Sequence, residues 1–242
     1  MKKVFSFLRL NIIPIAGVLF ISFLFTACKK TLNSGTHTPV AGLMAFNLVP
    51  DKAAVGVAIS GNVFTTSPLN YTNYTGGYLN VYTGSRNVES YDYTSQQILD
   101  STTQLFEDSA YYSVFVVGAN GHYKNIIVKD NVDSLSSSTG EAYVRYVNAI
   151  PDSTSQPKVT ISANGTNVFS DDAAFATVSG FKGVMPGDVA ITVNNEAAIN
   201  ASRTVTLEQG KIYTVLLTGL PGATDSTKAV AIKFIQNGSV TP

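Results

Sequence analysis

One motif of this 242-residue chain occurs twice, 101 positions apart. An apolar run leads to an asparagine and then to a proline–aspartate pair, as LMAFNLVPD at 43–51 and as VRYVNAIPD at 144–152. The repeated polar residues are Asn47, Pro50 and Asp51, then Asn148, Pro151 and Asp152. The same interval separates Tyr112 from Tyr213 further along. Such self-similarity predicts one unit of domain size written twice.

Short apolar stretches separated by turn residues fill both copies. In segment 188–193, DVAITV, the larger apolar residues alternate with smaller or polar ones, as in a strand with one buried face. No segment shows a convincing helical stripe flanked by caps; the tyrosines at 71, 74, 78 and 82 have helical spacing, but the Asn, Thr and paired Gly among them disfavour a helix. Many short strands with frequent turns are typical of a sandwich or a barrel. The expected strands are 43–49, 55–59, 78–82, 111–117 and 123–128 in the first copy, and 143–149, 158–163, 188–193, 203–208, 211–218 and 229–235 in the second.

One tyrosine in each copy narrows the choice of fold. Tyr213 follows Leu207 by six residues and begins an alternating strand, and Tyr112 follows Phe106 in the same way. This spacing resembles the tyrosine corner of immunoglobulin-like sandwiches, in which the phenol bonds to backbone a few residues upstream. The alternative is that both are ordinary tyrosines at the edge of a core. We predict an all-β chain with two tandem immunoglobulin-like, Greek-key β-sandwich domains.

The repeated Asn, Pro and Asp residues are predicted to be structural. Proline ends a strand, because it cannot donate a ladder hydrogen bond. Asparagine and aspartate side chains bond their own backbone in the turn that follows. We favour this interpretation over a ligand-binding role for the motif.

The N-terminus has the composition of a signal peptide. A basic head precedes an apolar run at 12–25, which is short for a membrane span. Small residues then lead to Cys28, the chain's one cysteine, in a pattern that resembles the lipobox of bacterial lipoproteins. The resemblance implies cleavage before Cys28 and its acylation, and two or more acyl chains hold a protein stably at a bilayer. The alternatives are a secretory signal that leaves Cys28 as a free thiol, and an uncleaved anchor.

The predicted domain boundaries follow from these patterns. Residues 1–27 are the signal peptide, and 28–40 are the acylated cysteine with a flexible tether. The first sandwich spans 41–132, a serine-rich linker spans 133–140, and the second sandwich spans 141–242. The residue after the cysteine is a lysine, not the aspartate that resembles an inner-membrane retention signal. This favours the outer membrane, with the face left open.

The second copy carries a longer motif. Val144, Arg145, an aromatic residue and Asn148 lead to Pro151, and an alternating strand, an Asn-Gly turn and a Val-Phe pair follow. This pattern resembles the bacterial domain-of-unknown-function family 4397 over most of residues 142–219. The likeness is fainter in the first copy, where Met44 replaces the arginine. The resemblance implies an exported β-sandwich, often lipid-anchored, with no assigned activity.

Residues that carry enzyme chemistry are scarce. His122 is the one histidine in either predicted domain, so a Ser–His–acid set would depend on it. Asp171 and Asp172 could supply carboxylates to a hydrolase, but no spacing supports this. The pair also lacks the surrounding pattern of a calcium loop, and zinc ligands are missing. We therefore expect no enzyme, no catalytic residue, no cofactor and no metal.

Tyrosines cluster in the first copy. Six of the twelve lie between residues 71 and 93. Tyrosine offers a large contact area with a polar tip and little entropy to lose, which suits a protein or glycan ligand. The alternative is that tyrosine simply suits half-exposed strands. The candidate binding residues are Tyr71, Tyr74, Tyr78 and Tyr82.

Asp-Ser pairs occur five times, more often than composition predicts. With the small or aliphatic residues that follow, they resemble the acceptor of a periplasmic O-glycosylation system. The alternative is that Asp-Ser is a good turn pair. The candidate acceptors are Ser101, Ser109, Ser134, Ser153 and Ser226.

These patterns favour a non-catalytic, lipid-anchored cell-envelope protein that binds or scaffolds another surface component. The expected partners are the membrane, through lipid on Cys28, and a protein or glycan ligand. A formal net charge of zero argues against nucleic acid. The alternatives are a structural spacer or glycan-carrying stalk and, least favoured, a carboxylate-based hydrolase.

Overall fold

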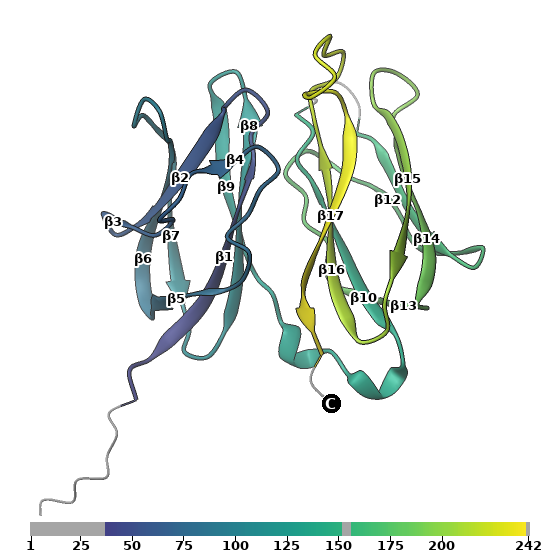
Figure 1. Ribbon diagram of the computed structural model, residues 1–242, viewed down its shortest axis with the longest axis horizontal. Helices are drawn as coiled ribbons and strands as arrows, with labels where there is room; N and C mark the ends of the chain where they lie inside the picture. The colour runs from purple at the N-terminus through teal and green to yellow at the C-terminus, as the bar shows by residue number, and fades with distance from the viewer. Residues whose placement is uncertain (1–36, 152–155, 241–242) are drawn as a thin grey trace, which may run out of the picture. The chain divides into compact units, whose positions relative to one another are not determined.

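The computed structural model describes residues 37–151 and 156–240. Pro39–Pro242 is one compact unit that holds two β-sandwiches in tandem (Figure 1). The predicted all-β fold of tandem immunoglobulin-like sandwiches is confirmed. The predicted signal peptide and Cys28 lie outside the described residues, as do Asp152 and Ser153. Within the described ranges, no helix is long and apolar enough to cross a membrane.

The first sandwich has two sheets, and its strand pairs are antiparallel except for one parallel pair inside one of the sheets. One sheet has the order β5-β1-β8-β9, with β1 and β8 parallel, and the other has the order β3-β2-β6-β7, with β4 beside β2. The strands are β1 (Val40–Leu48), β2 (Ala54–Ile59), β3 (Asn62–Val63), β4 (Leu69–Asn70), β5 (Leu79–Tyr82), β6 (Gly84–Asp92), β7 (Ile98–Phe106), β8 (Tyr111–Ala119) and β9 (His122–Lys129).

The second sandwich repeats this plan. Its sheets have the orders β13-β10-β16-β17 and β12-β11-β14-β15, and β10 and β16 are parallel. Two 3-10 helices, η1 (Val132–Ser134) and η2 (Ser137–Thr139), lie in the predicted linker. The strands are β10 (Ala142–Asn148), β11 (Lys158–Ala163), β12 (Thr166–Asp172), β13 (Lys182–Val184), β14 (Gly187–Asn194), β15 (Asn200–Leu207), β16 (Lys211–Thr218) and β17 (Ala231–Ser239).

The duplication extends to the register of the strands. Met44 lies opposite Ser113 in the first parallel pair, and Arg145 lies opposite Thr214 in the second. Both members of the second pair are 101 positions after those of the first. Equal spacing in sequence therefore places equivalent residues at equivalent points of the two sheets.

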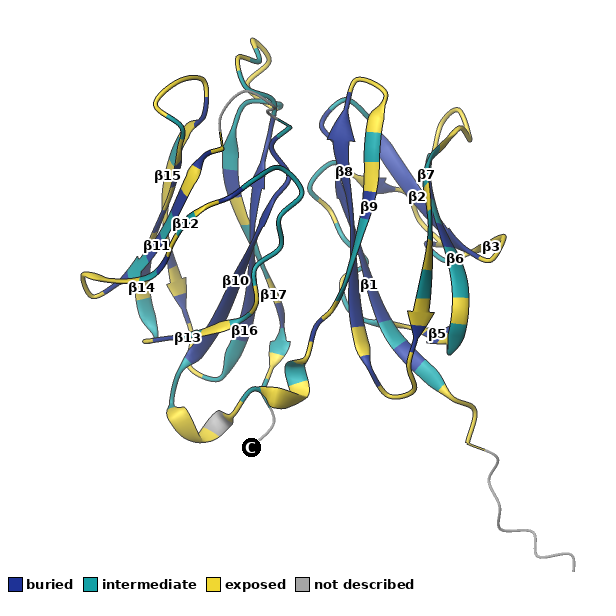
Figure 2. Cartoon of the chain, turned by 180° about the vertical axis from the view of Figure 1, so that it is seen from behind, coloured by how far each residue is buried: buried dark blue, intermediate teal, exposed yellow. Residues whose placement is uncertain are grey.

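Each sandwich has its own apolar core, and a third apolar cluster lies between the two sandwiches. The third cluster joins Met44, Phe46 and Phe115 of the first sandwich to Val147 and Leu216 of the second. Strands β1, β8, β10 and β16 are consequently buried on both faces for most of their length (Figure 2). One face of each strand covers its own core, and the other packs against the neighbouring sandwich.

A pair of equivalent glycines ends the strands that carry this contact. Gly118 and Gly219 have φ values of 115° and 110°, a region that glycine adopts without penalty. A Cβ atom would overlap the carbonyl oxygen of His122 at Gly118 and that of Ala229 at Gly219. The repeated glycine therefore has a steric cause in both copies.

Candidate functional site

The four candidate tyrosines do not form one surface. The Tyr74 ring stacks on Phe46, with centroids 5.4 Å apart, and both Tyr74 and Tyr78 pack against the apolar cluster between the sandwiches. Tyr71 is partly buried. Tyr82 alone among the four is well exposed, at 66%. Tyr74 and Tyr78 therefore serve the packing of the chain, and Tyr82 remains available to a ligand.

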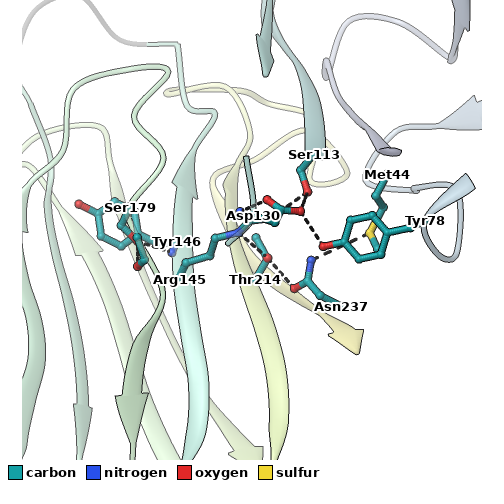
Figure 3. A network of polar contacts seen from close by, with 10 residues as sticks. Met44, Tyr78, Ser113, Asp130, Arg145, Tyr146, Ser179, Thr214 and Asn237 are labelled. Carbon is teal, nitrogen blue, oxygen red and sulfur yellow. Dashed lines mark hydrogen bonds and ion pairs between the residues drawn. The ribbon is translucent and has the colours of Figure 1, made fainter. Parts of the chain in front are cut away.

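A buried polar network joins the two sandwiches (Figure 3). Arg145 Nη1 donates to Asp130 Oδ1 at 2.5 Å, and the two side chains are 2% and 0% exposed. Asp130 Oδ2 also accepts from Ser113 Oγ and from Tyr78 Oη, both at 2.6 Å. Arg145 Nη2 donates to Ser113 Oγ at 2.9 Å, and its Nε donates to Thr214 Oγ1 at 3.0 Å.

Every polar group of this network finds a partner, which a buried charge requires. Removing two charges from water costs several kcal/mol for each ion, and good geometry with added hydrogen bonds is needed to offset that cost. The rings of Phe181 and Phe115 lie 4.4 Å and 5.4 Å from Arg145 Cζ and exclude water around the cation. The network therefore stabilises one specific contact between the sandwiches, and we assign it a structural role.

The equivalent positions with the roles of the two sandwiches reversed carry uncharged side chains. Met44 occupies the position equivalent to Arg145, and its sulfur lies 4.0 Å from Nδ2 of Asn237. Asn237 accepts from Thr214 Oγ1 at 2.6 Å, as Asp130 accepts from Ser113. The two sandwiches thus use equivalent positions at their contact. Arg145 of the second forms an ion pair with Asp130 of the first, and Met44 of the first contacts the amide of Asn237 of the second.

Two tyrosines beside carboxylates have raised pKa values. Burial and then the adjacent Asp130 raise the pKa of Tyr78 strongly, because both disfavour the phenolate. Burial, followed by the charge of Asp171, raises the pKa of Tyr146 to about 12. Tyr146 donates to Asp171 Oδ2 at 3.2 Å. Asp171 is thus a partner of a core tyrosine in this structure.

A groove opens at one edge of the first sandwich and includes Tyr82. It encloses about 380 Å³ between the β2–β3 hairpin (residues 59–64), strand β5 (residues 80–82) and Arg86. Val63 is 68% exposed at its rim. Arg86 donates to the carbonyl oxygens of Tyr82 and Thr83, and no carboxylate in the described chain is within ion-pair distance of it. The groove therefore combines an aromatic ring, apolar side chains and an unpaired cation.

The backbone of β5 is open along this groove. Strand β5 is the edge of its sheet and pairs with β1 alone. Gly42 donates its amide to Ala110 O, and Val40 donates to Asp108, so both point away from β5. Because pairing alternates along an antiparallel ladder, their partners Asn80 and Tyr82 direct their amides outward. These amides can bond to another extended chain.

The corresponding edge of the second sandwich is closed. Its strand β12 has seven residues, whereas β3 has two. Lys182 of β13 donates to Val168 O at 3.1 Å and lies 4.2 Å from the Phe169 ring, so it bridges the two edges. Phe169 is 1% exposed. The Val-Phe pair of the motif is thus covered in the second copy, while Val63 is exposed in the first.

The repeated turn residues lie where the motif predicts. Asn47 Oδ1 accepts from the amide of Val49 at 2.9 Å, and Asn148 Oδ1 accepts from the amide of Ile150 at 3.1 Å. Each Asn also donates to a carbonyl oxygen of a distant loop, at Leu69 and at Ala173. The prolines follow these turns.

The aspartate of the first motif has a different partner from the one expected. Asp51 Oδ2 accepts from the amide of Asn120 at 2.7 Å and from Tyr123 Oη at 2.9 Å. Asp51 therefore ties its turn to the β8–β9 turn and does not bond its own backbone through Oδ2. Its equivalent, Asp152, is outside the described residues.

Both predicted corner tyrosines bond to backbone five residues upstream. Tyr112 Oη accepts from the amide of Glu107 at 3.2 Å, and Tyr213 Oη accepts from the amide of Glu208 at 3.1 Å. Both side chains are buried. This is the geometry that the tyrosine corner requires, and it occurs in both copies.

The remaining candidates lie on the surface. The described candidate serines are all exposed, at Ser101, Ser109, Ser134 and Ser226. His122 is exposed at the start of β9. In the part of the chain that the structure covers, no group of three His, Cys, Asp or Glu side chains is placed to hold a metal ion.

The fold and the two sites define a tandem β-sandwich protein with a rigid contact between its halves. The family model for a domain of unknown function, DUF4397, matches residues 41–155 and again residues 142–237. The chain belongs to this family, so the resemblance seen in its sequence is confirmed. No match is found among curated proteins.

Solved structures from three Bacteroides species are similar to the chain at low identity. All three are candidate cell adhesion proteins. The one from Bacteroides fragilis has 10% identity and a TM-score of 0.22, covering 79% of this chain and 86% of that one. The one from Bacteroides eggerthii has 9% identity and a TM-score of 0.22, covering 84% of this chain and 96% of that one. The one from Bacteroides uniformis has 12% identity and a TM-score of 0.23, covering 82% of this chain and 98% of that one. At these TM-scores the likeness says nothing about what this chain binds.

Sequence reasoning missed the network and the groove. Arg145 was visible as a charged residue inside an apolar strand, which is a signal of a buried and paired group. Asp130, its partner, carried no such signal, because it follows a strand end. The groove depends on a β3 of two residues, and the Ser-Pro pair at 67–68, which favours a turn, was the available signal that the strand is short.

Proposed function

We propose that this chain is a non-catalytic, lipid-anchored protein of the bacterial outer membrane whose first sandwich binds an extended segment of another envelope protein. The segment would lie along β5, in the groove that holds Tyr82. The observation that carries the proposal is the difference between the copies: the groove edge is open in the first sandwich and closed by Lys182 in the second.

The chemistry of the groove suits an extended peptide. Outward amides at Asn80 and Tyr82 support strand addition, in which main-chain hydrogen bonds give affinity and pockets for alternate side chains give specificity. Val63 and the Tyr82 ring would cover an apolar side chain of the segment. Arg86 would attract a carboxylate, because it has no anionic partner of its own in the described chain.

The test is selection of displayed peptides on the mature chain, followed by binding measurements with variants. Tyr82→Ala is expected to weaken a selected peptide about tenfold or more, as loss of a central aromatic contact does. Asn80→Pro removes one outward amide without touching the β1 pairing, and it should also weaken binding. Met185→Ala is the matched control, since Met185 is an exposed apolar residue next to β13 in the second sandwich. Equal binding by all three variants would contradict the proposal.

The proposed anchor rests on the sequence pattern at Cys28. In detergent phase separation, the unaltered protein should enter the detergent phase and Cys28→Ser should enter the aqueous phase, because the acyl chains supply the membrane affinity. Mass analysis of the mature N-terminal peptide would show the fatty acids directly. A peptide that begins at residue 28 with no added lipid would rule the anchor out. Protease shaving of intact cells would then assign the membrane face.

A second candidate is a glycan-carrying spacer, and one observation favours it. Every described serine of the Asp-Ser pairs is exposed, so a glycosyltransferase could reach it. Intact mass after detergent extraction tests this function. A mass equal to that of the acylated polypeptide would end it, whereas discrete added hexose masses that disappear in Ser→Ala variants would support it.

A further inference from the structure

The outer face of the β3-β2-β6-β7 sheet presents half-buried and exposed side chains along β6 and β7. Side chains alternate along a strand, and Val88 of β6 points into the core. Tyr91 and Glu89 therefore point outward, as do their cross-strand partners Ile98 and Ser101 on β7. On the other side of β6, Gly56 of β2 lies opposite Tyr91.

The end of this face is a flat aromatic shelf. The Tyr91 ring lies against Gly56, where a Cβ atom would overlap the ring, so the phenol rests directly on the sheet. The Tyr93 ring is nearly parallel to it, with an interplanar angle of 19° and centroids 6.4 Å apart. Ile98 extends the shelf and is 57% exposed. Two near-parallel rings on a flat strand surface offer their faces to a flat ligand.

A row of polar side chains continues from the shelf along β6. Asn87 Nδ2 donates to Glu89 Oε1 at 2.8 Å, and Ser101 Oγ donates to Asn87 Oδ1 at 2.9 Å. These bonds hold the three side chains in place and leave Glu89 Oε2 without a protein partner in the described chain. Fixed acceptors beside an aromatic face match a ligand that has an apolar face and a hydroxyl rim.

We propose that this face binds a neutral glycan chain, with a sugar ring stacked on Tyr91 and Tyr93 and its hydroxyl groups bonded to Glu89 and Asn87. A pyranose has both features, because its C–H bonds form an apolar face and its hydroxyls project from the edge. An anionic polymer fits poorly, since Glu89 is negative and the nearby Lys52 is paired with Asp92 at 3.1 Å. This site is separate from the groove at Tyr82, on different side chains.

Binding to a panel of neutral polysaccharides of glucose, mannose and galactose tests the proposal. The chain has no tryptophan, so tyrosine fluorescence reports binding without a competing indole signal. Affinity electrophoresis gives a second measure of binding. Tyr91→Ala should reduce affinity at least about tenfold, because it removes a stacking ring, and Glu89→Gln should reduce it less, because one acceptor is kept. Tyr111→Ala is the control, since Tyr111 and Tyr93 are both 37% exposed. Tyr82→Ala should also bind glycan normally.

Two results would overturn the proposal. The first is no retardation by any polysaccharide of the panel at millimolar sugar with the unaltered, folded protein. The second is equal binding by the unaltered protein and Tyr91→Ala. Loss of folding in Tyr91→Ala would show in its thermal midpoint, and Tyr93→Ala, which removes a ring at the end of β6, then gives the decisive comparison.

Discussion

Arg145 of the second sandwich and Asp130, which follows the last strand of the first, form an ion pair with both side chains excluded from water. Asp130→Ala would leave the arginine cation buried without its partner, at a cost of about 3–5 kcal/mol of unfolding free energy. Arg145→Met, which copies the Met44 of the other half, combined with Asp130→Asn should lose less than the two single changes summed. Urea unfolding of the unaltered protein, Arg145→Met, Asp130→Asn and the double variant measures this coupling.

The exposed pair Lys129–Glu107 is the control for that experiment. Its nitrogen and oxygen lie 2.7 Å apart, but the side chains are 42% and 58% exposed. Lys129→Ala should leave the urea midpoint unchanged, because solvent screens such pairs. Additive effects of the Arg145 and Asp130 changes would contradict the view that the two residues act as one unit.

Stability should fall in alkaline solution through Tyr78 and Tyr146. Both pKa values are raised in the folded chain, that of Tyr146 to about 12, whereas a tyrosine in an unfolded chain titrates near about 10. Below about pH 10 the stabilisation is complete, and it is lost as the pH rises through the folded pKa, because the unfolded chain releases its protons first. Thermal midpoints measured at increasing alkaline pH should decline, and less steeply in the Tyr78→Phe, Tyr146→Phe double variant. Parallel declines would contradict this assignment.

The two tyrosine corners should contribute similar stability. Tyr112→Phe and Tyr213→Phe each remove one hydrogen bond to a backbone amide, at Glu107 and at Glu208, while keeping the ring. The expected cost of each is about 0.5–1.5 kcal/mol. Guanidinium unfolding of the single variants checks this. A loss in one copy and none in the other would show that only one of the tyrosines acts as a corner.

Hydrogen exchange should reveal the open edge of β5. The outward amides of Asn80 and Tyr82 are expected to exchange quickly in the free protein, while Val81, which faces Ala41 in the ladder, exchanges slowly. Addition of a groove-binding peptide should slow Asn80 and Tyr82 and leave Val81 as it was. Slow exchange at all three positions before any ligand is added would mean that the edge is already paired.

The repeat in the sequence was enough to predict the fold, because a constant interval of 101 residues places equivalent residues at equivalent positions of the paired strands. The corner tyrosines and the turn asparagines followed from local chemistry, which depends on residues near in sequence. The contact between the sandwiches did not follow, although a signal was present. Strands such as 111–117 and 211–218 are apolar without strict alternation, as expected for strands buried on both faces. The same covered face explains why Tyr74 and Tyr78, which the sequence predicts as ligand residues, pack inside the chain.

The unlike residues at Met44 and Arg145 make the two copies non-interchangeable partners. Two second sandwiches placed face to face would set each arginine against the neutral amide of Asn237, and two first sandwiches would enclose Asp130 with no cation. Either homotypic pair would bury a charge without an oppositely charged partner. Two chains are thereby discouraged from associating through like halves, and the contact forms only between a first and a second sandwich.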